Sequence, residues 1–268
     1  MTIGLTATAV LLYLLASLLL GNRLFRALSE YRSSRWSPLL LGGLGVLLHG
    51  AALYGVLFTD QGMDLAFFNM LSAVAWLVVV VFLFAAVTQP IENLGIIILP
   101  LAALAALLQP LFHTGAELIT GESRGLDLHI LLSVLSYSLL AIAAVQAGLL
   151  AVQDYHLRNR HPGGFIRALP PLETMERLLF QMIGVGFVLL TFSLLSGAVF
   201  LEDIFAQHLV HKTLLSIVAW VVFAVLLWGR WRTGWRGRTA IRWTLGGFAA
   251  LMLAYFGSKL VLELILGH

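Results

Sequence analysis

Residues 69–87 read NMLSAVAWLVVVVFLFAAV and contain no charged side chain. A helix needs about 20 apolar residues to cross the hydrocarbon core of a bilayer, and this stretch has that length. It therefore predicts a transmembrane helix, and the rest of the chain repeats the pattern. The eight predicted spans are residues 3–21, 38–58, 69–87, 94–112, 128–153, 178–200, 213–229 and 241–266.

The composition agrees with a polytopic membrane protein. Hydrophobic residues make up 60% of the 268, and charged residues make up 11%, against roughly 25% in a soluble domain. This balance excludes a soluble enzyme and a disordered chain. The predicted fold is all-α, with eight transmembrane helices in one integral membrane domain over residues 1–268.

The chain has no cysteine, which excludes disulfides, thiolate catalysis and covalent haem attachment. Any metal must be held by His, Met, Asp, Glu or a cofactor. No hydrolase, P-loop or dinucleotide-binding motif is present, so we expect no enzyme.

Charged residues are sorted by side. Arginines gather in the connections after the first, fifth and seventh spans, while acidic residues occupy the alternate connections. The positive-inside rule then places both termini on the outer, periplasmic side of a bacterial inner (plasma) membrane. The net charge of +3 reflects this topology and contact with membrane lipid, and no nucleic-acid partner is expected.

Three histidines stand out because polar groups inside a span cost free energy and mark function. His49 lies deep in the second span beside Gly50, and it is either hydrogen-bonded to a neighbouring helix or a metal or cofactor ligand. His129 and His211 begin the fifth and seventh spans at one depth. They are either ordinary residues at helix starts or a pair of imidazoles that ligates one haem iron.

Ser133, Ser136 and Tyr137 continue from His129 at helical spacing and form a polar stripe on one face. Such a stripe lines a cofactor or a solvated cavity, or it makes hydrogen bonds between helices. Lys259 and Glu263 form an i, i+4 pair in the last span. Together with His49 they leave a small-solute or ion carrier open as a third interpretation.

Six segments of the chain carry a resemblance to a known family. They are 128–130 (LHI), 135–137 (LSY), 196–198 (SGA), 211–220 (HKTLLSIVAW), 234–238 (GWRGR) and 255–258 (YFGS). These segments resemble the cytochrome c assembly membrane family, which includes the CcsA and CcmC haem-handling proteins. The similarity covers about residues 70–266, and over the whole chain it is nearest to the YpjD- and HemX-like branch.

The resemblance implies a haem-related role, with His129 matching a ligand of external haem. It departs from the pattern in three places. Residues 200–210 replace the family's tryptophan-rich WWD motif, and Trp228 stands where CcsA has a transmembrane histidine. The second external histidine, expected near the end of the last span, has no clear counterpart, since His268 is only roughly placed. His211 is an alternative second ligand that this sequence itself suggests.

The predicted function is an inner-membrane haem-binding or haem-handling protein of cytochrome c biogenesis or haem homeostasis, with haem b held non-covalently. The alternative is a membrane scaffold or regulator without haem that acts through a partner protein. The candidate ligands are His129, His211 and His49, and the candidate lining residues are Ser133, Ser136 and Tyr137.

Overall fold

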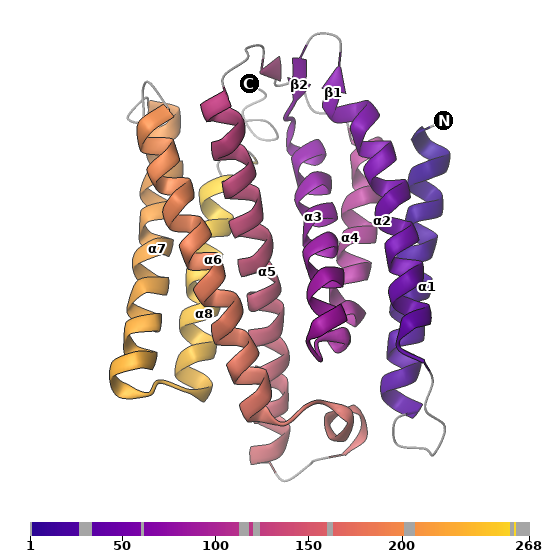
Figure 1. Ribbon diagram of the computed structural model, residues 1–268, viewed down its shortest axis with the longest axis vertical. Helices are drawn as coiled ribbons and strands as arrows, with labels where there is room; N and C mark the ends of the chain where they lie inside the picture. Colours follow the sequence, from indigo (N-terminus) through magenta and orange to yellow (C-terminus); the bar gives the residue numbers. More distant parts are fainter. Residues whose placement is uncertain are drawn as a thin grey trace. The chain divides into compact units, whose positions relative to one another are not determined.

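The computed structural model describes residues 2–26, 34–59, 62–112, 118–119, 124–159, 163–200, 207–257 and 260. Within these ranges it has eight helices long and apolar enough to cross a membrane, which confirms the predicted all-α membrane fold (Figure 1). The helices are α1 (Thr2–Arg26), α2 (Trp36–Leu57), α3 (Phe67–Thr88), α4 (Gly95–Leu111), α5 (Arg124–Arg158), α6 (Leu172–Phe200), α7 (Gln207–Thr233) and α8 (Gly237–Met252). The side on which the termini lie stays a prediction.

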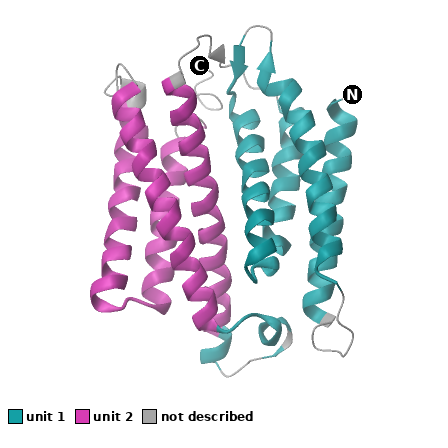
Figure 2. Cartoon of the chain, viewed as in Figure 1, with its two compact units in different colours: residues 1–121, 156–171 teal, residues 122–155, 172–268 magenta. Residues whose placement is uncertain are grey.

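The helices divide into two compact units (Figure 2). The first unit comprises residues 1–121 and 156–171 and holds α1 to α4. The second comprises residues 122–155 and 172–268 and holds most of α5 with α6 to α8. This division does not test whether the chain forms a single integral membrane domain, which stays a prediction.

In the first unit, α1 buries one face against α2 and α4. Ala9, Tyr13 and Ala16 recur at helical spacing and are fully buried. Gly45 of α2 makes room for the Tyr13 ring, because a Cβ at that position would lie 2.7 Å from Tyr13 Cε1. This close approach brings the Tyr13 hydroxyl to His49, one turn further along α2.

The helix α4 continues through Pro100. Proline has no N–H, so the carbonyl of Ile96, four residues earlier, loses its usual helical donor. The hydroxyl of Ser17 on α1 donates to that carbonyl at 3.1 Å. A side chain from a neighbouring helix thus supplies the missing hydrogen bond, as membrane interiors require.

A small antiparallel sheet, which the sequence did not predict, closes one end of the first unit. Its strands are β1 (Phe58–Thr59), β2 (Gly62–Asp64) and β3 (Leu118–Ile119), in the order β1-β2-β3. Phe58 pairs with Met63, and Met63 pairs with Ile119. The short 3₁₀ segments η1 (Glu92–Leu94) and η2 (Gly164–Ala168) belong to the same unit.

In the second unit, Trp220 of α7 packs on α6. Its ring stacks on Phe187 at 5.4 Å between centroids, and its indole N–H donates to Thr191 Oγ1 at 2.9 Å. Gly234, in the turn from α7 to α8, has a φ of 68°, which favours glycine. The helix α8 ends in a π-helical turn, η3 (Leu253–Gly257).

Candidate functional site

His129, one of the predicted ligands, is half-buried in the first turns of α5 and faces α6. Its Nδ1 lies 3.0 Å from the carbonyl oxygen of Ser193 and 3.1 Å from Ser196 Oγ. A carbonyl accepts hydrogen bonds and never donates them, so Nδ1 carries the proton. In the neutral imidazole the lone pair is then on Nε2.

The hydroxyl groups of the neighbouring serines donate to acceptors other than the His129 ring. Ser196 donates to the Ser193 carbonyl at 2.8 Å, and Ser133 donates to the His129 carbonyl at 2.7 Å. The Ser193 hydroxyl lies 2.7 Å from Ser133 Oγ and can donate there. The contact of Ser133 Oγ with His129 Nε2 is long, at 3.5 Å. The network therefore leaves the Nε2 lone pair without a strong donor.

This arrangement has the chemistry of a metal-binding imidazole. Histidine ligands donate their second ring N–H to a carbonyl or carboxylate, which fixes the tautomer and the ring orientation. The Ser193 carbonyl makes that contact with His129. The donor set thus fits an iron ligand at Nε2.

An apolar groove of about 420 Å³ lies between α5 and α6 beside this network. Ser196, which contacts His129, is one of its walls. The other lining residues are apolar: Leu128, Leu132, Phe192, Leu195, Val199 and Phe200. The groove is thus an apolar surface that adjoins the network through Ser196, and His129 itself is not among its lining residues.

The polar stripe on α5 makes hydrogen bonds between helices. Ser133 contacts Ser193, and Ser136 is buried and donates to the carbonyl of Gly186 at 3.0 Å. Tyr137 instead packs between the rings of Phe248 and Phe256, on the side of α8 and η3. For Ser133 and Ser136, the structure thus shows the interhelical hydrogen bonds that one of the two interpretations of this stripe predicts.

The Tyr137 hydroxyl is buried, yet it has no hydrogen-bond partner among the residues that the structure describes. An unpaired buried hydroxyl costs free energy. This orphaned polar atom, on the same helix as His129, keeps Tyr137 among the candidate cofactor-lining residues.

His211 is exposed in the second turn of α7. No hydrogen bond or ring contact joins it to His129 within the described parts of the chain. The pairing of His211 with His129 therefore stays a prediction.

His49 lies in the first unit and is 1% exposed. Its Nδ1 is hydrogen-bonded to the Tyr13 hydroxyl at 3.3 Å, and its Nε2 to Ser72 Oγ at 2.9 Å. Both ring nitrogens therefore have partners on neighbouring helices, α1 and α3. A ligand role for His49 requires one of these bonds to break, and it stays a prediction.

Four residues that sequence reasoning missed complete these networks: Tyr13, Ser72, Ser193 and Ser196. Each is a polar side chain inside an apolar span, and Ser193 and Ser196 recur at i, i+3 on one face of α6. This spacing of polar residues in an apolar span could have identified Ser193 and Ser196 from the sequence alone. Lys259 and Glu263, the carrier candidates, lie outside the described residues.

The sequence profile of the "Cytochrome C assembly protein" family matches residues 36–266. The chain belongs to the cytochrome c assembly protein family. The match begins well before residue 70, where the resemblance was expected to start, and it includes α2 with His49.

Several known proteins are similar to this chain in sequence. Inner membrane protein YpjD of Escherichia coli K12 is 36% identical, over 83% of this chain and 85% of that protein. Cytochrome c biogenesis protein CcsA of Microcystis aeruginosa is 26% identical, over 84% and 86%. An uncharacterized 28.8 kDa protein of Azospirillum brasilense is 35% identical, over 68% and 69%. No solved structure matches the chain.

These relatives and the eight spans confirm a multi-pass inner-membrane protein. They also confirm the resemblance to YpjD and CcsA. The HemX-like part of that resemblance stays a prediction.

Proposed function

We propose that this member of the cytochrome c assembly family handles haem in cytochrome c biogenesis or haem homeostasis, with His129 as an axial ligand. The observation that carries the proposal is the His129 network. The Ser193 carbonyl accepts from Nδ1–H at 3.0 Å and leaves the Nε2 lone pair for iron. Family membership and the CcsA relative support the same process.

When bound, haem b supplies an iron that accepts imidazole nitrogens at its axial positions. The chain's residues would hold it without a covalent bond, since there is no cysteine. Ser193 and Ser196 orient the His129 ring, and the apolar groove between α5 and α6 lies beside this network. The chain binds and passes on its cargo, and we propose no bond-making chemistry for it.

Haem retention in the purified full-length protein tests this role. The chain is expressed with a supplied haem precursor, solubilised in mild detergent, and measured by absorption and by pyridine haemochromogen for stoichiometry. We expect a Soret band in the native protein. Replacing His129 with alanine lowers the retained haem by about tenfold or more, because the iron loses a protein ligand.

His156→Ala is the matched control, since His156 packs against Phe165 in the other compact unit. We expect the His156→Ala variant to retain as much haem as the native protein. His211→Ala and His49→Ala identify the second ligand in the same assay. Absence of haem from the native protein, together with a protein that co-purifies stably, overturns the proposal and favours a scaffold or regulator that acts through a partner.

A further inference from the structure

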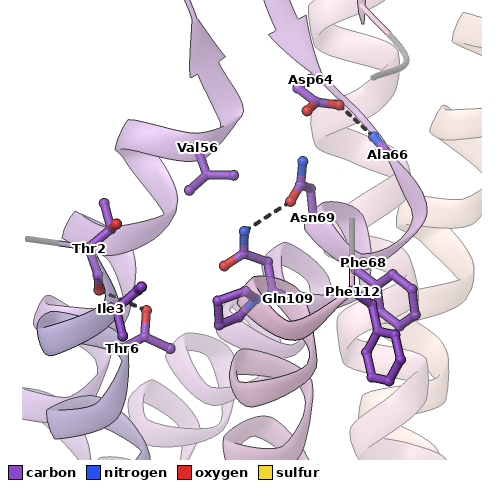
Figure 3. A pocket seen from close by; sticks show the side chains of 11 residues that line it. Thr2, Ile3, Thr6, Val56, Asp64, Ala66, Phe68, Asn69, Gln109 and Phe112 are labelled. Atoms are coloured by element: carbon purple, nitrogen blue, oxygen red, sulfur yellow. Dashed lines mark hydrogen bonds between the residues drawn. The ribbon is translucent and has the colours of Figure 1, made fainter. Parts of the chain in front are cut away.

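A second cavity lies wholly within the first unit, at the end that carries the small sheet (Figure 3). Its volume is about 270 Å³, near the lower end of small-molecule pockets at roughly 300 Å³. Its lining comes from the beginnings of α1 and α3 and the ends of α2 and α4. The pocket is therefore at the level where these spans end, that of the lipid headgroups.

Asp64 is the one charged side chain among the described residues that line the pocket. One carboxylate oxygen accepts from the backbone N–H of Ala66 at 3.0 Å, which fixes the side chain at the start of α3. The structure shows no hydrogen bond to the other oxygen from any described residue. The pocket wall thus presents a fixed negative charge.

A pair of amides continues this wall. Gln109 donates from Nε2 to Asn69 Oδ1 at 3.1 Å, and Asn69 is 8% exposed. Within the described chain, Gln109 Oε1 and Asn69 Nδ2 make no hydrogen bond. Figure 3 shows Gln109 reaching between α1 and Asn69, with its oxygen directed away from Asn69. A ligand in the pocket can pair with either atom.

The rings of Phe68 and Phe112 also line the pocket and stack on each other, with centroids 5.1 Å apart and planes at 21°. Aromatic faces attract cations. Metal ions suit the pocket less well, because calcium takes six to eight oxygen ligands and the described residues contain no group of three or more acidic, His or Cys side chains.

We propose that this pocket binds a primary ammonium group, with Asp64 as the counter-ion and the amides of Asn69 and Gln109 as further polar partners for the rest of the ligand. The level of the pocket makes the headgroup of a phosphatidylethanolamine lipid one source and a small free amine the other. The inference is independent of the proposed role of His129, which lies in the second unit.

Calorimetric titration of the full-length protein in detergent tests the site, with ethanolamine as the probe and choline as the matched ligand. Ethanolamine binds more tightly, because the methyl groups of choline remove the N–H donors. Asp64→Asn preserves the acceptor for Ala66 and lowers the affinity by about tenfold, the loss of one charge-assisted contact. Gln109→Glu adds a second carboxylate and raises the affinity. The control is Glu173→Gln, because Glu173 is an exposed acidic residue on α6. This substitution leaves the affinity for ethanolamine unchanged.

The lipid source is tested by mass spectrometry of lipids retained from micelles that hold equal amounts of phosphatidylethanolamine and phosphatidylcholine. Enrichment of the former in the native protein, lost in Asp64→Asn, identifies a lipid headgroup. Ethanolamine binding without enrichment identifies a free amine. Equal affinity of native protein and Asp64→Asn, or neither binding nor enrichment, overturns the proposal.

Discussion

The hydrogen bond from Ser17 to the Ile96 carbonyl exists because Pro100 cannot make it. Ser17→Ala removes the hydroxyl donor and leaves a carbonyl unpaired between two packed helices. Pro100→Ala restores an N–H four residues after Ile96, which can close the helical bond. The two substitutions are therefore expected to be coupled.

The magnitude follows from the surroundings of the bond. Ser17 is buried and its bond to the carbonyl is 3.1 Å long. Side-chain hydrogen bonds in membrane proteins contribute about 0.6 kcal/mol on average and up to about 1.7, while an orphaned buried acceptor costs about 1–3 kcal/mol. We expect Ser17→Ala to lower the free energy of unfolding by about 1 kcal/mol, a factor of about five in the equilibrium constant.

Reversible unfolding in mixed micelles, followed by circular dichroism, measures this double-mutant cycle. In the Pro100→Ala background Ser17→Ala costs about a third as much, because Ile96 keeps a donor. Thr8→Ala is the control on the same helix, since its hydroxyl is exposed and bonds the Gly4 carbonyl of α1 itself. An equal cost of Ser17→Ala in both backgrounds refutes the reasoning.

Two further substitutions test the packing by the same unfolding measurement. Gly45→Ala places a methyl group 2.7 Å from the Tyr13 ring and lowers the free energy of unfolding by about 1–3 kcal/mol. The control is Gly43→Ala, whose methyl group meets nothing within 4 Å, and it leaves the stability unchanged or slightly higher. Equal effects of the two substitutions would contradict the contact between Gly45 and Tyr13. Tyr137→Phe removes an unpartnered buried hydroxyl and raises stability by up to about 1 kcal/mol, so a clear loss would reveal a bond to that hydroxyl.

Much of the fold was predictable because length and hydropathy alone determine whether a segment can span a bilayer. The run at 69–87 lies inside α3, and the other seven runs each correspond to a helix. The helix ends were less predictable: α7 begins at Gln207 and ends at Thr233, beyond the apolar core of residues 213–229. Strands of two or three residues are too short to show a period, so the sheet was missed.

The candidate site was predictable as a set of residues but not as a set of contacts. A polar side chain in an apolar span can be recognised from sequence, as His49 and His129 were. Its partners depend on which helices are neighbours, and that information is tertiary. The His129 partners come from α6, through Ser193 and Ser196. A pairing with His211 requires in addition that the starts of α5 and α7 lie close together.

The proposed binding of haem iron by Nε2 of His129 is tested most directly by a haem titration of His129→Gly. The full-length variant is titrated with and without imidazole, and the Soret band is followed. We expect weak binding that free imidazole restores toward the native affinity by occupying the vacated position. Native affinity in His129→Gly without imidazole would contradict it.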